Sequence, residues 1–176
     1  MAAHDSDLPV RDAVDQLMEQ WRLVRPDVDV SAMAVFGRLH RSFYRYLDQI
    51  VPVFEKHGIN MAAFDVLSAL RRSGPPFRRT AGELAQQTLV TTGGITLRVK
   101  RLEAAGLVTR EGDPDDGRVV HVRLTPAGLA VIDAVVEDHF RNERRMLEGL
   151  SEAEQRELAR LLSRVELSLE LAKISE

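Results

Sequence analysis

The feature that most constrains the fold is the order of the elements predicted between residues 80 and 125. Thr80 and Glu83 have the spacing of a capping box, in which both side chains satisfy free backbone N–H groups at a helix start. This helix should end near Gln87. Thr91 then opens a second helix, which ends before Gly106, a residue suited to the left-handed position after a helix. Two alternating strands over residues 107–111 and 119–124, joined by a polar loop, complete the order of a winged helix-turn-helix.

Longer helices are predicted on both sides of this module. Proline and capping signals place them at residues 10–24, 31–56, 60–72, 126–148 and from 151 onward. Pro52 lies inside the second of these and should kink or shorten it. The predicted fold is therefore mainly α with a small β-hairpin, a winged helix-turn-helix between long N- and C-terminal helices. We divide this one continuous domain into an N-terminal helix and arm (1–30), a long helix (31–57), the winged lobe (58–125) and the C-terminal helices (126–176).

Composition narrows the classes of protein. The 176 residues include no Cys, which excludes a disulfide scaffold, a thiolate zinc site, a Cys nucleophile and thiol-based oxidant sensing. No apolar run is long enough to span a membrane, and the acidic N-terminus lacks the apolar stretch of a signal peptide, so we expect a cytoplasmic protein. The five His residues are scattered, and neither a phosphate loop nor a nucleophile elbow is present. We therefore predict no enzyme, no catalytic or metal site and no cofactor.

Charge is distributed unevenly along the chain. The net charge is −3, but residues 71–123 carry ten Lys+Arg against six Asp+Glu, and both flanking ends are acidic. This asymmetry indicates a local surface for a polyanion on an otherwise acidic body, although chance variation on solvated faces would give the same counts.

The second helix of the module has a core side and an opposite side. At 100° per residue, Ile95, Val99 and Leu102 form the core stripe, and Arg98 flanks it, leaning toward the protein body. Small hydroxyl and basic side chains on the opposite side suit the major groove of DNA, and glycines at the helix start allow close approach to phosphates. The predicted DNA-binding residues of this helix are Thr91, Thr92, Gly93, Thr96, Lys100 and Arg101.

These motifs resemble the MarR family of bacterial transcription regulators. The resemblance is carried by FDVL at residues 64–67, RLEAAGLV at 101–108, and DGR at 116–118 followed by LTPAG at 124–128. It covers most of residues 33–172. It implies that Arg118 is the wing residue that enters the minor groove, where a guanidinium is attracted by the negative potential. Asp116 would hold Arg118 in place, although the acidic residues here could equally form a simple turn.

The resemblance also implies a homodimer built from the first and last helices. Apolar faces within residues 36–54, 131–135 and 158–169 would supply the dimerisation interface. A two-fold dimer implies a pseudo-palindromic operator with half-sites about one helical turn apart. Repression is the usual mode of the family.

The N-terminal helix is similar to the one that characterises the urate-responsive branch of this family. That branch lines its pocket with a Trp of the added helix, an Asp of the third helix and an Arg of the recognition helix, and the matching positions are Trp21, Asp65 and Arg98. Trp stacks on a planar heterocycle, Arg neutralises its charge and a carboxylate accepts a ring N–H. We therefore expect a small aromatic anion such as urate as effector. The alternatives are a packing role for Trp21, an ordinary salt bridge for Arg98, a different signal (a phenolic acid, another metabolite or pH), and a winged-helix protein-interaction module.

Overall fold

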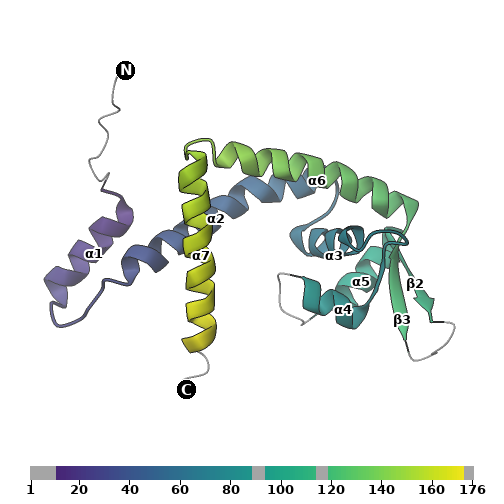
Figure 1. Cartoon of the computed structure of the whole chain (residues 1–176), viewed down its shortest axis with the longest axis horizontal. Helices are drawn as coiled ribbons and strands as arrows, with labels where there is room; N and C mark the ends of the chain where they lie inside the picture. The colour runs from purple at the N-terminus through teal and green to yellow at the C-terminus, as the bar shows by residue number, and fades with distance from the viewer. Residues whose placement is uncertain (1–10, 89–93, 114–118, 173–176) are drawn as a thin grey trace. The chain divides into compact units, whose positions relative to one another are not determined.

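The computed structural model describes residues 11–88, 94–113 and 119–172. The predicted class, mainly helical with a small sheet, is confirmed. The chain forms two compact units, of which the first ends at Gln49 and the second begins at Ile50. The elements, labelled in Figure 1, are α1 (Ala13–Val24), α2 (Met33–Lys56), α3 (Met61–Arg72), β1 (Arg78–Thr80), α4 (Ala81–Gln87), α5 (Ile95–Ala104), β2 (Val108–Gly112), β3 (Val120–Leu124), α6 (Pro126–Met146) and α7 (Glu152–Ala172).

The first unit joins α1 to the start of α2. Asp12 caps α1 by accepting hydrogen bonds from the backbone N–H groups of Val14 and Asp15, and the Asp15 side chain completes a capping box. Val14 and Met18 are buried. Arg38 of α2 binds the carboxylates of Asp12 and Asp15 at 3.0 and 2.8 Å, so ion pairs as well as apolar contact attach α1 to α2.

The core of the second unit is built around α3. Asn60 caps this helix, as the sequence predicts, and Val66, Leu67 and Leu70 have no exposed surface. Helices α4, α5 and α6 and strand β3 all pack against α3. In Figure 1 they gather around it beside the β2–β3 hairpin. The winged lobe is therefore held together by one central amphipathic helix.

The sheet has one strand more than the sequence analysis predicts. Its order is β1-β3-β2, all antiparallel, and β1 pairs Arg78 with Arg123 and Thr80 with His121. The prediction of a two-stranded hairpin was wrong on this point. The three residues of β1 carry too short a pattern to be detected locally, and their partner strand lies about forty residues further along the chain.

The predicted start of one helix needs correction, and one of the two effects predicted for Pro52 is excluded. The second helix of the module begins at Ile95 and not at Thr91, because Gly94 takes a left-handed φ of 108° as its N-cap. Thr91, Thr92 and Gly93 lie outside the described residues. Pro52 does not shorten α2, which continues through it to Lys56.

Polar caps define the two C-terminal helices. Thr125 caps α6 through the Gly128 N–H, and its hydroxyl donates to the carbonyl of Gly106 at 2.8 Å, which fastens the start of α6 to the end of α5. Ser151 and Glu154 form the predicted capping box of α7. Helix α7 has no buried residue among its 21 positions.

Candidate nucleic-acid interface

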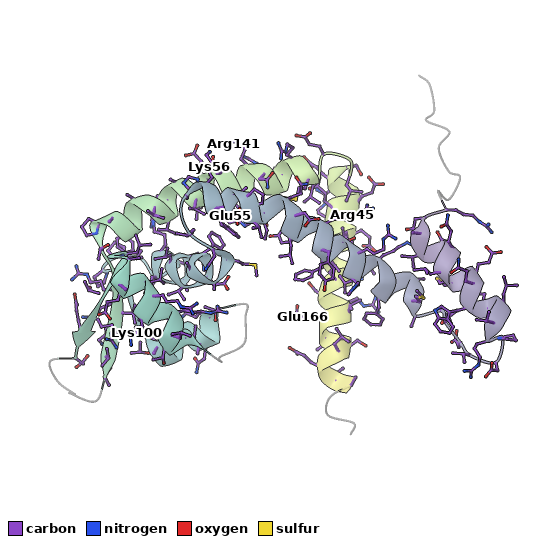
Figure 2. The ribbon with its side chains drawn as sticks, turned by 180° about the vertical axis from the view of Figure 1, so that it is seen from behind. Arg45, Glu55, Lys56, Lys100, Arg141 and Glu166 are labelled. Atoms are coloured by element: carbon purple, nitrogen blue, oxygen red, sulfur yellow. The ribbon has the colours of Figure 1, made fainter. Side chains whose placement is uncertain are left out.

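Helix α5 presents the two sides that its sequence predicts. Ile95, Val99 and Leu102 are buried on the core side. Thr96, Lys100 and Arg101 are exposed on the other side, where Figure 2 labels Lys100. Within the described parts of the chain, Lys100 and Arg101 form no ion pair, so their charges are available to an external anion.

Helix α4 is held at its start by a charged cap. The Thr80 N–H donates to the Glu83 carboxylate at 2.7 Å, and the Glu83 N–H donates to the Thr80 hydroxyl at 3.2 Å. Hydrogen bonds from Thr80 are the main reason why the pKa of Glu83 lies below its ordinary value. Leu84 is fully buried one residue later, so α4 is anchored by its cap and its apolar side chain behind α5.

Strands β2 and β3 are joined through residues 114–118, which lie outside the described residues. The Asp113 N–H donates to the Val119 carbonyl at 2.9 Å, which continues the pairing of the two strands beyond β2. The predicted wing residues Asp116 and Arg118 lie outside the described residues. The sequence analysis missed His121, whose ring lies 2.9 Å from the Asp113 carboxylate. The one signal that could have found it is the position of a His facing an acidic loop across a short hairpin.

Arg98 points away from the exposed side of α5 and contacts α3. Its guanidinium lies 3.3 Å from the Asp65 carboxylate, and the two side chains are only 19% and 13% exposed. Burial raises the pKa of Asp65 above its ordinary value, and the opposing attraction of Arg98 does not fully compensate. The structure therefore brings together two of the three predicted ligand residues, in the ion pair that was the alternative interpretation of Arg98.

An open cavity of about 370 Å³ lies between the start of α3 and the second half of α5. Arg98 and Arg101 line it together with Asn60 and apolar residues from the start of α3 and the end of α5, and its lining contains no carboxylate. Asp65 lines a separate, smaller cavity of about 220 Å³. The larger cavity thus offers two guanidinium groups and apolar walls, a combination that suits an anion with an apolar body.

Trp21 belongs to the first unit of the chain. It is 49% exposed and lines a cavity of about 390 Å³ with Arg25, Val28 and Met33. The Arg25 guanidinium is paired with Asp27 at 2.6 Å. The apolar lining and the indole face suit a planar ligand, and they also suit a packing contact, which leaves both interpretations of Trp21 in place.

The described ranges contain neither a helix that could cross a membrane nor a group of side chains that could hold a metal ion. None of their helices combines the length and apolar character that a membrane crossing needs. Across residues 11–88, 94–113 and 119–172, no three His, Asp or Glu side chains come together in a group that could hold a metal ion.

A short braced helix, an exposed basic helix and a hairpin beside them define a winged helix-turn-helix protein of the DNA-binding class. The model of the MarR family matches residues 57–119. The transcriptional regulator PecS from Dickeya dadantii is 38% identical over 156 residues, which cover 89% of this chain and 94% of PecS. The chain belongs to the MarR family and is a DNA-binding transcriptional regulator.

Solved structures agree with this assignment. BpsR from Bordetella bronchiseptica, whose DNA binding is regulated by 6-hydroxynicotinic acid, has a TM-score of 0.69 at 25% identity, covering 79% of this chain and 97% of BpsR. A mutant MarR from E. coli in complex with operator DNA has a TM-score of 0.67 at 26% identity, covering 78% of this chain and 99% of that one.

Proposed function

We propose that this regulator is a repressor that binds a pseudo-palindromic operator as a homodimer and is released by a small aromatic anion such as urate. The observation that carries the proposal is the ion pair between Arg98 of α5 and Asp65 of α3, at 3.3 Å. It connects the exposed helix of the interface to a semi-buried carboxylate whose ionisation is disfavoured by burial. A ligand anion that competes for Arg98 would therefore act directly on α5.

Operator recognition is assigned to α5 and the wing. Thr96, Lys100 and Arg101 are exposed on the side of α5 that would face the major groove. Thr91, Thr92 and Gly93 would contact phosphates just before this helix. Arg118, supported by Asp116, would enter the minor groove.

The salt dependence of DNA binding tests this assignment. Arg118→Ala should weaken operator binding and reduce the slope of log affinity against log salt by roughly one if its guanidinium neutralises one phosphate. A variant with unchanged affinity and slope would remove Arg118 from the interface and favour a protein-interaction module.

Exposed apolar faces support the homodimer. In α7, Leu158, Leu161, Leu162 and Leu169 are each more than 40% exposed, and Phe36 and Phe43 of α2 are about half exposed. Exposed apolar stripes on two separate helices are unusual on a monomer and indicate a protein interface. A second copy of the chain covers such faces symmetrically. Sedimentation analysis should give a dimer, and Leu161→Glu should dissociate it.

Release by an anion follows from the position of Arg98. An anion in the cavity of about 370 Å³ would bind the Arg98 guanidinium in place of Asp65. Because Arg98 is part of α5, this exchange would shift the recognition helix relative to DNA. The ligand shifts the equilibrium only by its preference for the released conformation. Trp21 stays a proposed ligand residue because of the family resemblance, and its substitution tests that role separately.

A second effector class is supported by a relative. BpsR responds to 6-hydroxynicotinic acid, which is an aromatic acid rather than a purine. Both molecules are planar anions, and both suit a guanidinium beside apolar walls. Phenolic acids and other metabolites should be titrated in the same experiment.

The decisive experiment is a titration of protein bound to a fluorescent operator from the DNA beside its own gene, at fixed salt. Urate, and in a parallel series 6-hydroxynicotinate, should release the wild-type protein. Arg98→Ala should keep its DNA affinity and lose the response. Arg71→Ala, on the same lobe but outside the cavity lined by Arg98, should respond like the wild type. Unchanged responses in both Trp21→Ala and Arg98→Ala would refute the assigned ligand residues.

A further inference from the structure

The β2–β3 hairpin contains, at the end next to residues 114–118, a partly buried contact between a histidine and a carboxylate that the proposed function does not use. His121 is the second residue of β3, and its Nε2 atom lies 2.9 Å from the Asp113 Oδ2 atom. Asp113 follows the last residue of β2, and its N–H donates to the Val119 carbonyl at 2.9 Å. We propose that His121 is a positioning residue for DNA binding, which holds the root of the wing through Asp113 and holds it most strongly when its imidazole is protonated. This inference rests on the proposed contact between the wing and DNA.

Partial burial of this contact reduces solvent screening, so the attraction between the imidazole and the carboxylate is stronger than at an exposed site. The His121 and Asp113 side chains are 16% and 23% exposed. A carboxylate can only accept hydrogen bonds, so the Nε2 atom of His121 carries the donated proton. Its Nδ1 atom is buried and has no hydrogen-bond partner among the described residues. A proton added at Nδ1 breaks no existing hydrogen bond and converts the contact with Asp113 into an ion pair. The ion pair has to outweigh the cost of a buried N–H group without an acceptor among the described residues.

His121 also lies where the wing meets the first helix of the module. Its cross-strand partners are Thr80 of β1 and Glu111 of β2. Thr80 and Glu83 form the cap of α4, and the charge of His121 is among the smaller influences that lower the pKa of Glu83, after the hydrogen bonds from Thr80. One imidazole thus connects the wing root electrostatically to the start of α4.

The charged groups around His121 are balanced in number. Three guanidinium groups come from β3 and β1: Arg123, which lies 3.5 Å from Glu111, Arg78, its cross-strand partner, and Arg79, which acts on Glu83. Three carboxylates come from the wing root, β2 and α4, which are Asp113, Glu111 and Glu83. An imidazolium here therefore gives this group of side chains a net positive charge at a surface that would approach phosphates.

The expected consequence is a loss of DNA affinity as the pH rises. Histidine side chains change charge between about pH 5 and 8. Protonated His121 holds Asp113 by an ion pair, and neutral His121 holds it by a weaker hydrogen bond. Binding of the operator should therefore take up protons, and part of this uptake should disappear when His121 is replaced.

The experiment measures operator affinity at pH 6 and pH 8, at fixed salt, for the full chain. His121→Gln should weaken binding roughly ten-fold at pH 6, the size expected for loss of one charge-assisted hydrogen bond, and roughly two-fold at pH 8. In an Asp113→Asn background the same substitution should change the affinity by less than about two-fold, because its partner is already gone.

His57→Gln is the matched control. His57 contacts Asp138 at the same distance, 2.9 Å, with 18% and 20% exposed side chains, but it lies between α2 and α3, outside the wing. Its pH profile of DNA binding should follow that of the wild type. Thermal unfolding checks that each variant folds, and if His121→Gln does not, Asp113→Asn alone should flatten the wild-type pH profile by the same amount.

Two results would overturn the inference. One is a pair of parallel pH profiles for the wild type and His121→Gln, and the other is a full effect of His121→Gln in the Asp113→Asn background. Arg118→Ala separates this failure from that of the proposed function. If Arg118→Ala weakens binding and His121→Gln does not, only the role of His121 is refuted. If Arg118→Ala changes nothing, the contact between wing and DNA is itself refuted.

Discussion

Replacing Gly128 by alanine should destabilise the junction between the wing and α6. Gly128 lies in the first turn of α6, where the helix approaches the backbone of Leu107. A Cβ atom at this position would overlap the Leu107 carbonyl oxygen and lie 2.9 Å from its carbon. The same oxygen accepts a hydrogen bond from the Thr125 N–H at 3.1 Å. The three atoms nearest to the added methyl group all belong to the backbone of Leu107 and not to a flexible side chain. The start of α6 must therefore shift.

The magnitude follows from three contributions. Overpacking of a tight contact costs about 1–3 kcal/mol. Loss of the hydrogen bond between Thr125 and Leu107 adds about 1 kcal/mol, while alanine is better than glycine in a helix by about 1 kcal/mol. The last two contributions cancel, so the net loss in the free energy of unfolding is about 1–3 kcal/mol. For a chain of this length, such a loss lowers the midpoint of thermal unfolding by roughly 2–12 °C.

Thermal unfolding followed by circular dichroism, at one protein concentration, measures this effect. The matched control is Gly82→Ala in α4, where the nearest atom to an added Cβ is the Thr80 hydroxyl oxygen at 4.0 Å. This variant should melt at or slightly above the wild-type temperature. If Gly128→Ala melts within about 2 °C of the wild type, the start of α6 adapts to the methyl group and the steric argument is refuted.

Three further predictions concern other contacts. Asp138→Asn should lower the stability at pH 7. Hydrogen bonds first from Lys56 and then from His57 hold the pKa of Asp138 at about 2. The stabilisation is therefore present above pH 3.8 and disappears as the pH falls toward 2. The thermal midpoints of the wild type and the variant should converge at low pH, and a constant difference would contradict the assignment. Figure 2 labels Lys56 near Arg141 of α6, which also pairs with Asp138. Arg38→Ala should speed hydrogen exchange of the α1 amides, because it removes both ion pairs to the start of α1; unchanged exchange would show that apolar contact alone holds the helix. Acrylamide should shorten the fluorescence lifetime of Trp21, because the side chain is half exposed. Urate should protect Trp21 from this quenching, and the lifetime is not distorted by absorption of light by urate. Equal quenching with and without urate would place the ligand elsewhere.

The sequence predicts the local elements of this protein well because their signals are local. Capping boxes at Thr80 and Ser151, and the caps at Asn60 and Thr125, depend on side chains within three residues of the backbone groups that they satisfy. The core stripe of α5 follows from the helical period alone. The family and the class of function follow from motifs that span these same elements, and the comparisons confirm both.

Contacts between distant residues were decided by the tertiary structure alone. Strand β1 exists because β3 provides its partner, and α5 begins at Ile95 because the left-handed Gly94 is its N-cap. The pairing of Arg98 with Asp65, and the second guanidinium beside Arg98 in the cavity, depend on how α5 packs against α3. No periodicity within one segment encodes such a packing.

His121 shows most clearly which features the sequence determines and which depend on the tertiary structure. The sequence shows a histidine in an alternating strand, and alternation alone places its side chain on the outer face of the hairpin. Only the register of β2 with β3 brings its ring to Asp113, and only the added strand β1 brings it beside the cap of α4. The sequence by itself therefore determined the helices, their caps and the family. The tertiary structure decided which charges meet, because Coulombic and hydrogen-bond energies depend on distances that are set by packing across the whole lobe.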